Sequence, residues 1–280
     1  MPSSLKQILI ETKESLRNQS PSPEADAESL ITYIKNISKL DLLTKQDEIS
    51  FNDEEINKLK ILIERRINNE PIAYVINKKE FFSRNFYVDK RVLIPRPETE
   101  IIIEEVLKRN KKQNISCLDL GTGSGCLIIS LFLELQSIGI NVKAEAVDIS
   151  DGALKVASQN AINLKADINF YKSFWFKNVQ RKFDYIVANP PYIPENDERV
   201  SVETHEHEPH LALYSGVSGE EALSEIISQV PSFLFEDGMF LMEFGAGQGE
   251  AVRRLSEKYF KSCEILQDLQ GIERVFVGMV

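Results

Sequence analysis

Beyond Ile101, short apolar runs alternate with segments of helical pattern, and this alternation restricts the possible fold more than any other feature of the chain. A helix between two strands of one sheet must cross back over that sheet, so the strands that it joins run parallel. A parallel sheet in turn needs helices on both of its faces. Two runs near the end, 263–268 and 274–280, meet at a short turn around Gly271 and predict an antiparallel pair. The other predicted strands cover residues 115–120, 143–148, 168–171, 183–188 and 239–244.

The first 72 residues carry apolar side chains at helical spacing instead. Ser22 before Pro23 predicts the start of one helix, and Asn52 with Glu55 three residues later predicts the capping box of another. Two asparagines and a proline within residues 68–71 predict the end of that helix. We therefore predict a small helical domain, which either packs on the rest of the chain or docks a partner. Its two apolar stripes are Leu5, Ile8, Leu9, Leu16 and Ala27, Leu30, Ile31, Ile34.

Between these regions, residues 73–94 alternate in polarity and are rich in Phe, Tyr, Val and Ile, which is typical of strands. We predict a β-hairpin here that turns around Ser83, Arg84 and Asn85. The predicted organisation is therefore a helical domain over residues 1–72, a β-hairpin linker over residues 73–94 and an α/β domain over residues 95–280.

Charge and cysteine content restrict the partners and the compartment. A formal net charge of -10 disfavours stable binding to nucleic acid, because phosphate binding needs clustered lysine and arginine. Cys117 and Cys126 lie in apolar runs and are interpreted as core thiols in a reducing compartment. No apolar run approaches the ~20 residues of a membrane span, and the N-terminal residues lack the apolar core of a cleavable leader. We expect a cytoplasmic protein with no membrane partner.

The segment LDLGTGSGCL, residues 118–127, follows a predicted strand and opens an apolar helical run. Its glycines allow a sharp turn and a close approach of a ligand to the main chain. Asp148, at the end of the next predicted strand, can accept hydrogen bonds from ribose hydroxyls. The G-x-G-x-G spacing departs from the dinucleotide fingerprint, and no Walker lysine follows. The segment resembles the first motif of class I S-adenosylmethionine-dependent methyltransferases, whose Rossmann-like seven-stranded sheet also ends in an antiparallel strand.

The segment ANPPYI, residues 188–193, ends a predicted strand with residues that stop both strand and helix. Ligands of open α/β sheets gather at the carboxyl ends of strands, so we expect this segment beside the cofactor. The side-chain oxygen of Asn189 and the carbonyl of Pro190 can accept both N–H bonds of an amide or amine nitrogen. Pro191 helps to hold the backbone rigid, and Tyr192 offers a ring to a planar group. NPPY is similar to the fourth motif of methyltransferases that act on adenine, cytosine or glutamine nitrogens.

Several longer segments together resemble the release-factor glutamine N5-methyltransferases, the PrmC/HemK family, from residue 69 to residue 280. They are residues 69–100, which end in LIPRPETE, and the segments LDLGTGSG, AVDISDGALKVASQNA, FDYIVANPPYI, EPHLALYSG and DLQGIERVFVG. DNA adenine methyltransferases share NPPY but lack LIPRPETE. The resemblance implies S-adenosyl-L-methionine as methyl donor, S-adenosyl-L-homocysteine as product, and the glutamine of the GGQ loop of peptide-chain release factors as substrate. It also implies that the helical domain helps to bind the release factor.

The resemblance assigns roles by position. Asp148 would take the ribose hydroxyls, and Trp175 would lie beside adenine, with Phe174 as the alternative. The segment 96–99, Arg-Pro-Glu-Thr, either shapes the cofactor entrance or serves folding. The methionine and ribose part of the cofactor would be lined by Gly121, Thr122, Gly123, Ser124 and Gly125. The glutamine side chain would be bound by Asn189, Pro190, Pro191 and Tyr192, with Asn189 and Pro190 as catalytic acceptors and Asn189 also beside the cofactor.

Other readings concern three features. HEHEPH, residues 205–210, resembles a metallo-β-lactamase ligand run, but Pro209 stands where Asp is needed and the chain has no further histidine. We predict a polar loop near the substrate entrance there and no metal site.

Glu243 is either a second acid near the pocket or a carboxylate bonded to local backbone. The alternative function is a nucleic-acid adenine-N6 methyltransferase, and another is a methyltransferase fold that binds cofactor or partner without turnover.

Overall fold

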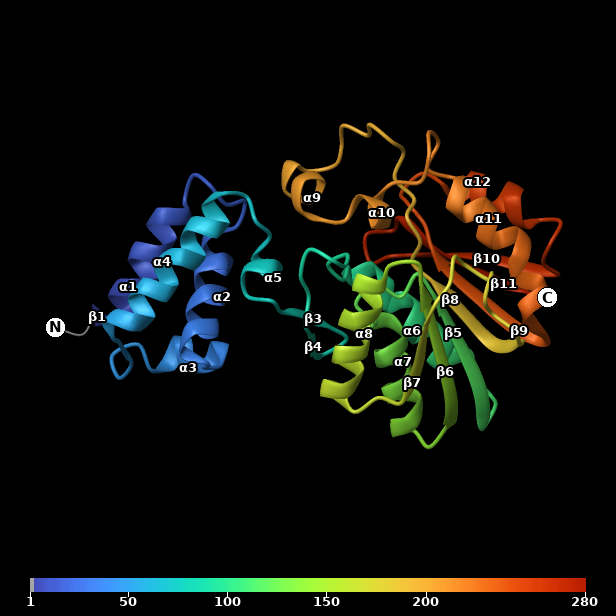
Figure 1. Ribbon diagram of the computed structural model, residues 1–280, viewed down its shortest axis with the longest axis horizontal. Coiled ribbons are helices and arrows are strands. Elements are labelled where there is room, and N and C mark those ends of the chain that lie inside the picture. Colours follow the sequence, from blue (N-terminus) through green and yellow to red (C-terminus); the bar gives the residue numbers. More distant parts are fainter. Residues whose placement is uncertain (1–2) are drawn as a thin grey trace. The chain divides into compact units, whose positions relative to one another are not determined.

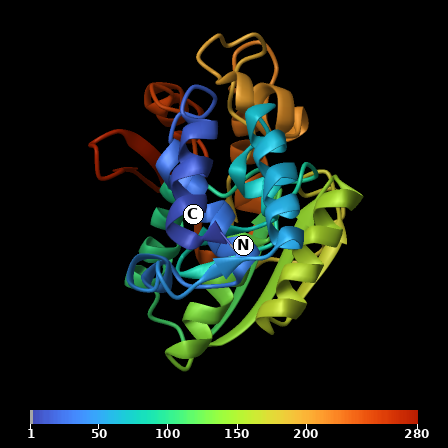
Figure 2. The same cartoon turned by 90° about the vertical axis from the view of Figure 1, so that its left-hand side faces the viewer.

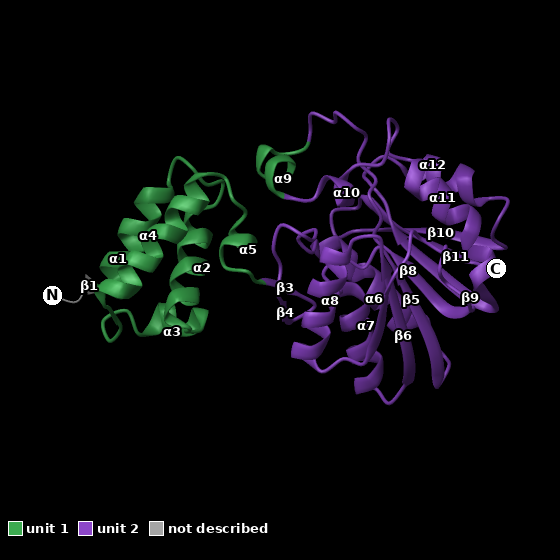
Figure 3. Cartoon of the chain, in the orientation of Figure 1, with its two compact units in different colours: residues 1–78, 200–207 green, residues 79–199, 208–280 purple. Residues whose placement is uncertain are grey.

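The structure is a computed structural model that describes residues 3–280, and it falls into two compact units (Figure 3). We call them the helical unit, which comprises the residues up to Lys78 together with Val200–His207, and the sheet unit, which comprises Lys79–Arg199 and Glu208–Val280. The structure thus divides residues 73–94, the predicted linker, between the two units at Lys78.

Three helices, α1 (Leu5–Leu16), α2 (Pro23–Lys35) and α4 (Asp53–Ile67), make up most of the helical unit (Figures 1 and 2). The Asn52–Glu55 capping box begins α4 as predicted, with both reciprocal hydrogen bonds. Ser22 precedes α2 as predicted, but its side chain does not cap the helix. The remaining elements before residue 79 are α3 (Lys39–Thr44), which was not predicted, α5 (Ile72–Val75), and the antiparallel strands β1 (Ser3–Ser4) and β2 (Ser50–Phe51).

A short helix from the second half of the chain, α9 (Val202–His207), also belongs to the helical unit. Its Glu203 accepts a hydrogen bond of 2.8 Å from Nη1 of Arg66 in α4, and Asp26 in α2 accepts one of 2.6 Å from Nε of the same side chain. The Arg66 side chain is only 3% exposed. A buried guanidinium is costly unless carboxylates pair with it, so α9 supplies part of what the helical unit needs.

A β-hairpin is present within the predicted segment 73–94, but it is limited to β3 (Lys79–Phe81) and β4 (Arg84–Phe86), and the first three residues of that segment belong to helix α5. Its turn consists of Phe82 and Ser83, both with positive φ, so it lies one to two residues before the predicted turn at 83–85. Two positive φ values suit the right-handed twist of a two-residue hairpin. Phe81 and Phe86 are buried in the core of the sheet unit, which explains why the hairpin belongs to that unit.

A seven-stranded sheet forms the centre of the sheet unit, in the order β10-β11-β9-β8-β5-β6-β7. The pairs among β5, β6, β7, β8 and β9 are parallel, and β11 runs antiparallel to both β9 and β10. The prediction of a mainly parallel α/β sheet that ends in an antiparallel pair is confirmed. The strands are β5 (Asn114–Leu120), β6 (Asn141–Asp148), β7 (Ile168–Lys172), β8 (Phe183–Ala188), β9 (Leu234–Glu243), β10 (Ser262–Gln267) and β11 (Glu273–Met279).

Alternate side chains of each strand enter two separate cores, one on each face of the sheet. In β5, Cys117 packs in the core that α6 (Glu100–Arg109), α7 (Cys126–Ser137) and α8 (Asp151–Leu164) help to form, whereas Leu118 and Leu120 pack in the other core. That second core includes side chains of α11 (Glu221–Gln229) and α12 (Gly249–Ser256). Figure 1 shows the ribbons of these two helices beside the sheet. Because successive side chains point to opposite faces, both faces of the sheet are covered by a core. A ligand can therefore reach the sheet at the ends of its strands.

Shorter elements complete the sheet unit: the 3₁₀ helices η1 (Pro97–Thr99) and η2 (Val230–Phe233) and the helix α10 (His210–Leu213). η1 lies directly before α6, and α10 follows the segment that contributes α9 to the helical unit. Within residues 3–280, no helix combines the length and the apolar character that crossing a bilayer would need.

Candidate active site

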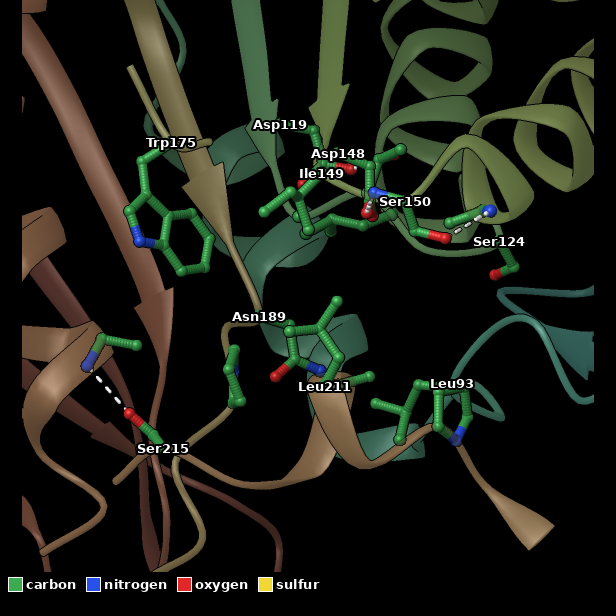
Figure 4. A pocket seen from close by; sticks show the side chains of 18 of the residues that line it. Leu93, Asp119, Ser124, Asp148, Ile149, Ser150, Trp175, Asn189, Leu211 and Ser215 are labelled. Atoms are coloured by element: carbon green, nitrogen blue, oxygen red, sulfur yellow. Dashed lines mark hydrogen bonds between the residues drawn. The ribbon is translucent and has the colours of Figure 1, made fainter. Parts of the chain in front are cut away.

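A cavity of about 350 Å³ lies at the carboxyl ends of the parallel strands, within the sheet unit. Its wall includes Asp119 of β5, Asp148 of β6 and Asn189, which follows β8 directly. Figure 4 shows Asp148, Trp175 and Asn189 around this cavity. Because parallel strands end at one edge of the sheet, side chains that are distant in sequence converge there.

The glycine loop that follows β5 adopts the left-handed conformations that its sequence predicts. Gly121, Gly123 and Gly125 have φ values of 71°, 55° and 79°, which a side chain would strain. Of the five predicted loop residues, only Gly121, Thr122 and Ser124 line the cavity. The Gly123 N–H donates to Asp148 Oδ2 at 2.9 Å. Gly123 therefore fixes the carboxylate of Asp148 and does not itself line the cavity. Gly125 is the N-cap of α7 and packs closely against α8.

Asp148 is held by backbone N–H groups on both of its oxygens. Oδ2 accepts from Gly123 and Oδ1 accepts from Ser150 at 2.8 Å. Burial raises the pKa of Asp148 above its ordinary value, and the backbone hydrogen bonds oppose that shift. Each carboxylate oxygen has a second lone pair, so the side chain can still accept hydrogen bonds from a ligand in the cavity.

Asp119 is a second acid in the cavity wall, and the sequence reasoning missed it. It is 1% exposed, and Thr122 Oγ1 donates to its Oδ2 at 2.7 Å. Burial raises the pKa of Asp119 to about 7, with a smaller contribution from the charge of Asp148. The position could have been recognised, because an acid two residues before the first loop glycine lies at the end of a strand that points at the ligand.

The NPPY segment divides its side chains between the cavity and the protein interior. Asn189 and Pro191 line the cavity, whereas Pro190 is buried and is not part of the wall. Tyr192 is also absent from the wall, because its hydroxyl donates to Glu243 Oε1 at 2.9 Å. The Tyr192 hydroxyl is thus bonded to the end of β9, and the packing of the Tyr192 ring against the substrate stays a prediction.

Two neighbouring aromatic side chains, Phe174 and Trp175, both line the cavity. Phe174 is 46% exposed, whereas Trp175 is partly buried and adopts an uncommon φ of 43°. A Cβ on Gly121 would lie 3.4 Å from Trp175 Cζ3, so the indole ring covers the glycine loop. This contact favours Trp175 over Phe174 as the ring that a planar base would meet.

The predicted entrance segment, residues 96–99, is fastened by Glu208. This carboxylate is 4% exposed and accepts from the backbone N–H of Ile94 at 2.9 Å and from Arg96 Nη2 at 2.5 Å. Arg96 itself does not line the cavity, but Thr99 does. Glu208 thus joins two segments of the sheet unit that both border the cavity, and neither contact has a local sequence signal.

The three histidines of HEHEPH do not form one group. His205 and His207 lie in α9 of the helical unit, and His210 begins α10 of the sheet unit. Within the part of the chain that the structure describes, no three His, Cys, Asp or Glu side chains are grouped so that they could hold a metal ion. Pro209, Leu211 and Tyr214 of this region line the cavity.

Comparisons with known proteins identify the family and the fold. A family model described as the PrmC N-terminal domain matches residues 7–76, and one described as the methyltransferase small domain matches residues 97–206. A release factor glutamine methyltransferase from Neisseria gonorrhoeae is 38% identical over 91% of this chain and 93% of its own length. A bifunctional methyltransferase from Rickettsia typhi is 38% identical over 98% of this chain, but the chain spans only 57% of that longer protein.

A methyltransferase structure from Pyrococcus furiosus superposes with a TM-score of 0.52 at 17% identity and covers 77% of this chain and 95% of its own. With the seven-stranded sheet, the glycine loop and the acid after the next strand, these features define a class I S-adenosylmethionine-dependent methyltransferase. At the level of sequence the assignment is narrower. The chain belongs to the release factor glutamine methyltransferase family.

Proposed function

We propose that this protein transfers the methyl group of S-adenosyl-L-methionine to the side-chain amide nitrogen (N5) of the glutamine in the GGQ motif of peptide-chain release factors. The product of the cofactor is S-adenosyl-L-homocysteine. The single observation that carries this proposal is the position of Asn189, whose amide lies on the wall of the cavity that also contains Asp119 and Asp148. Family membership supports a glutamine nitrogen, since the relative from Neisseria gonorrhoeae is named a release factor glutamine methyltransferase.

Asn189 and Pro190 are proposed to position the glutamine. An amide nitrogen is a poor nucleophile because its lone pair is delocalised into the carbonyl. Acceptance of both of its N–H bonds, by Asn189 Oδ1 and the Pro190 carbonyl, fixes the nitrogen in line with the methyl group. The N–CH₃ bond forms as the S–CH₃ bond breaks, the electron pair of that bond stays on sulfur, and the amide proton leaves to water. Positioning and fixed dipoles therefore supply the catalysis, with no strong base.

The residues of the cavity fit the proposed cofactor. S-Adenosylmethionine supplies an electrophilic methyl group when it is bound, and its other parts are a ribose, an adenine and an ammonium group. Asp148 retains lone pairs for the ribose hydroxyls, and Trp175 with Ile149 offers apolar surface for the adenine. Asp119, buried and close to the loop, offers a carboxylate for the cationic part.

The helical unit is proposed to bind the release factor, as the family resemblance implies, and the protein is proposed to act in the cytoplasm. The net charge of the whole chain, -10, supports a protein substrate over a nucleic acid. The alternative of adenine-N6 methylation shares the NPPY chemistry, so it becomes an outcome of the same assay.

Transfer of labelled methyl groups tests the proposed function. We expect purified protein to label a release factor, and a release factor whose GGQ glutamine is replaced by glutamate to remain unlabelled. Mass spectrometry of the GGQ peptide should show one added methyl group on the glutamine. Label on DNA or RNA instead would support the adenine-N6 alternative, and label on none of these substrates would contradict an enzymatic role on them.

A second expected result concerns pH. Because the folded pKa of Asp119 is about 7, the carboxyl must lose its proton to bind a cation, and cofactor affinity should rise with pH. From pH 5.5 to pH 7.5 we expect the affinity to rise about sevenfold, because a neutral side chain at this position should keep about a tenth of the affinity that the wild-type protein has at pH 7.5. Isothermal titration calorimetry in buffers of different ionisation enthalpy would measure both the affinity and the proton released.

The Asp119→Asn variant is the matched control for this pH effect. It should bind the cofactor about tenfold more weakly at pH 7.5, which is the loss of one charge-assisted contact, and its affinity should be nearly independent of pH. If the variant keeps the wild-type pH dependence, then another group, such as Asp148, must carry the titration.

A further inference from the structure

A chain of hydrogen bonds links Asn189 and Thr99, which both line the cavity, to the buried Glu243. Asn189 Nδ2 donates to Thr99 Oγ1 at 3.0 Å, and Thr99 Oγ1 donates to Glu243 Oε2 at 2.5 Å. The other oxygen of Glu243 accepts from the Tyr192 hydroxyl at 2.9 Å. Thr99 is 3% exposed and Glu243 is 1% exposed, so water cannot easily replace any of these partners.

The direction of this chain follows from counting protons. A threonine hydroxyl has one proton, and an ionised carboxylate can only accept. Thr99 therefore donates its one hydroxyl proton to Glu243, and its oxygen can only accept a hydrogen bond from Asn189. The Asn189 amide must therefore donate from its NH₂ group. The opposite orientation would place Asn189 Oδ1 against Thr99 Oγ1, whose one proton is already donated to Glu243. Asn189 Oδ1 is then directed away from Thr99.

We infer that Glu243, acting through Thr99, sets the orientation of the Asn189 amide, so that Oδ1 and not Nδ2 faces the N–H bonds of the substrate. Thr99 and Glu243 are positioning residues in this scheme, and neither touches the reacting atoms. The inference rests on the proposed function, since only a substrate with N–H bonds needs an acceptor at this place. It explains why an isolated acid is buried at the end of β9, where burial of a charge is otherwise costly.

The surroundings of Glu243 make this orientation sensitive to pH. Burial raises the pKa of Glu243, its hydrogen bonds from Thr99 and Tyr192 oppose the shift, Glu98 adds to it and Arg274 counteracts it. A protonated Glu243 can donate to Thr99, and Thr99 can then donate to Asn189 Oδ1, which reverses the chain. Transfer should therefore decline as the pH falls through the raised pKa of Glu243, even when cofactor is saturating.

Substitution of Thr99 separates the hydroxyl from the shape of the side chain. Thr99→Val preserves shape but removes the hydroxyl, and we expect kcat to fall about 10- to 100-fold, comparable with the loss of one preorganised hydrogen bond at a reacting centre. Thr99→Ser keeps the hydroxyl and loses only a methyl group, so kcat should return to within about threefold of wild type, as expected for a retained hydrogen bond. Cofactor affinity, measured by calorimetry, should change little in either variant. A large loss of affinity would indicate that the variant is misfolded.

Glu243→Gln tests the direction itself. A glutamine at 243 has one oxygen for two hydroxyl donors and places an NH₂ group against the other, so the chain no longer has one direction. We expect kcat at saturating cofactor to fall about tenfold at pH 8, which is part of the effect of one preorganised hydrogen bond. The decline of kcat at low pH, which we call the acid limb of the pH profile, should disappear in this variant. An acid limb that persists unchanged in Glu243→Gln, or equal kcat in Thr99→Val and Thr99→Ser, would overturn the inference.

The amide protons of Asn189 give a readout that does not depend on any substrate. With asparagine side chains labelled with ¹⁵N, the Asn189 NH₂ group should show one proton shifted downfield and protected from exchange in wild type and Thr99→Ser. Both properties should be lost in Thr99→Val. If this pattern holds while the release factor is not methylated, the proposed function fails and the orientation stands; if methylation occurs without the pattern, the orientation fails alone.

Discussion

Replacement of Asn189 by alanine is expected to lower the rate of methyl transfer at least about 1000-fold, the upper range seen when one preorganised polar group is removed from a reaction centre. Among the side-chain contacts of residues 3–280, Asn189 has one partner, Thr99, and its oxygen is the proposed acceptor for the substrate amide. Without that oxygen the nitrogen is no longer held in line with the methyl group. The proposed cofactor contacts of Asp148 and Trp175 do not involve Asn189, so cofactor affinity should stay nearly the same.

Single-turnover transfer to the release factor and calorimetric titration of cofactor measure the two quantities separately. Asn163→Ala is a suitable control, because Asn163 is exposed on α8 and bonds only to Gln159 among the described side-chain contacts. The control should match wild type in both measurements. A large loss of cofactor affinity in Asn189→Ala would mean that this side chain serves mainly the cofactor, and a rate near wild type would remove it from the catalytic step.

Gly125→Ala is expected to lower the free energy of unfolding of the sheet unit by about 3 kcal/mol, the sum of left-handed backbone strain and overpacking. Gly125 has a φ of 79°, and a Cβ there would lie 2.8 Å from Ile129 Cδ1 and 3.1 Å from Ala157 Cβ. It would also lie 3.3 Å from the Ala157 Cα, which is backbone and cannot rotate away. Helices α7 and α8 would have to separate, and the glycine loop that α7 continues would move with them.

Gly123→Ala offers a matched comparison, because Gly123 has a φ of 55° but no atom lies within 4 Å of its virtual Cβ. This variant carries the backbone strain alone and should cost only about 1 kcal/mol. Urea denaturation of both variants beside wild type measures the difference, and cofactor titration should show the larger loss of affinity for Gly125→Ala. Equal destabilisation of the two variants would show that the contact between α7 and α8 is not what requires glycine at 125.

Most of the sheet could be predicted from the sequence because strands such as β5 and β8 contain short, largely apolar runs that end at a turn. β9 shows the limit of that reasoning. It begins at Leu234, five residues before the predicted start at 239, because its first part is exposed and reads as a polar turn. Helix α3 was missed for a related reason, since it is a six-residue helix whose Ser38–Asp41 capping box stands out only once its hydrogen bonds are known.

The candidate site was predictable where its chemistry is local. The glycine loop, Asp148 and Asn189 each belong to a short motif, and the structure brings them to one cavity. The support behind Asn189 was not predictable, because Thr99 and Glu243 are 144 positions apart and neither belongs to a motif that mentions the other. The direction of Tyr192 depends on the same acid, so its assignment to the substrate was made without the partner that determines where its hydroxyl points.

Helix α9 has a consequence for how such a protein can change over generations. The helical unit is encoded in two separate stretches of the chain, residues up to Lys78 and Val200–His207, and the second lies inside the stretch that encodes the sheet unit. A gene segment for the first stretch alone would carry Arg66 without Glu203, one of its two carboxylate partners. Transfer of the first stretch alone would therefore leave the buried Arg66 with Asp26 as its remaining carboxylate partner, so we expect the two stretches to work best when they are kept together.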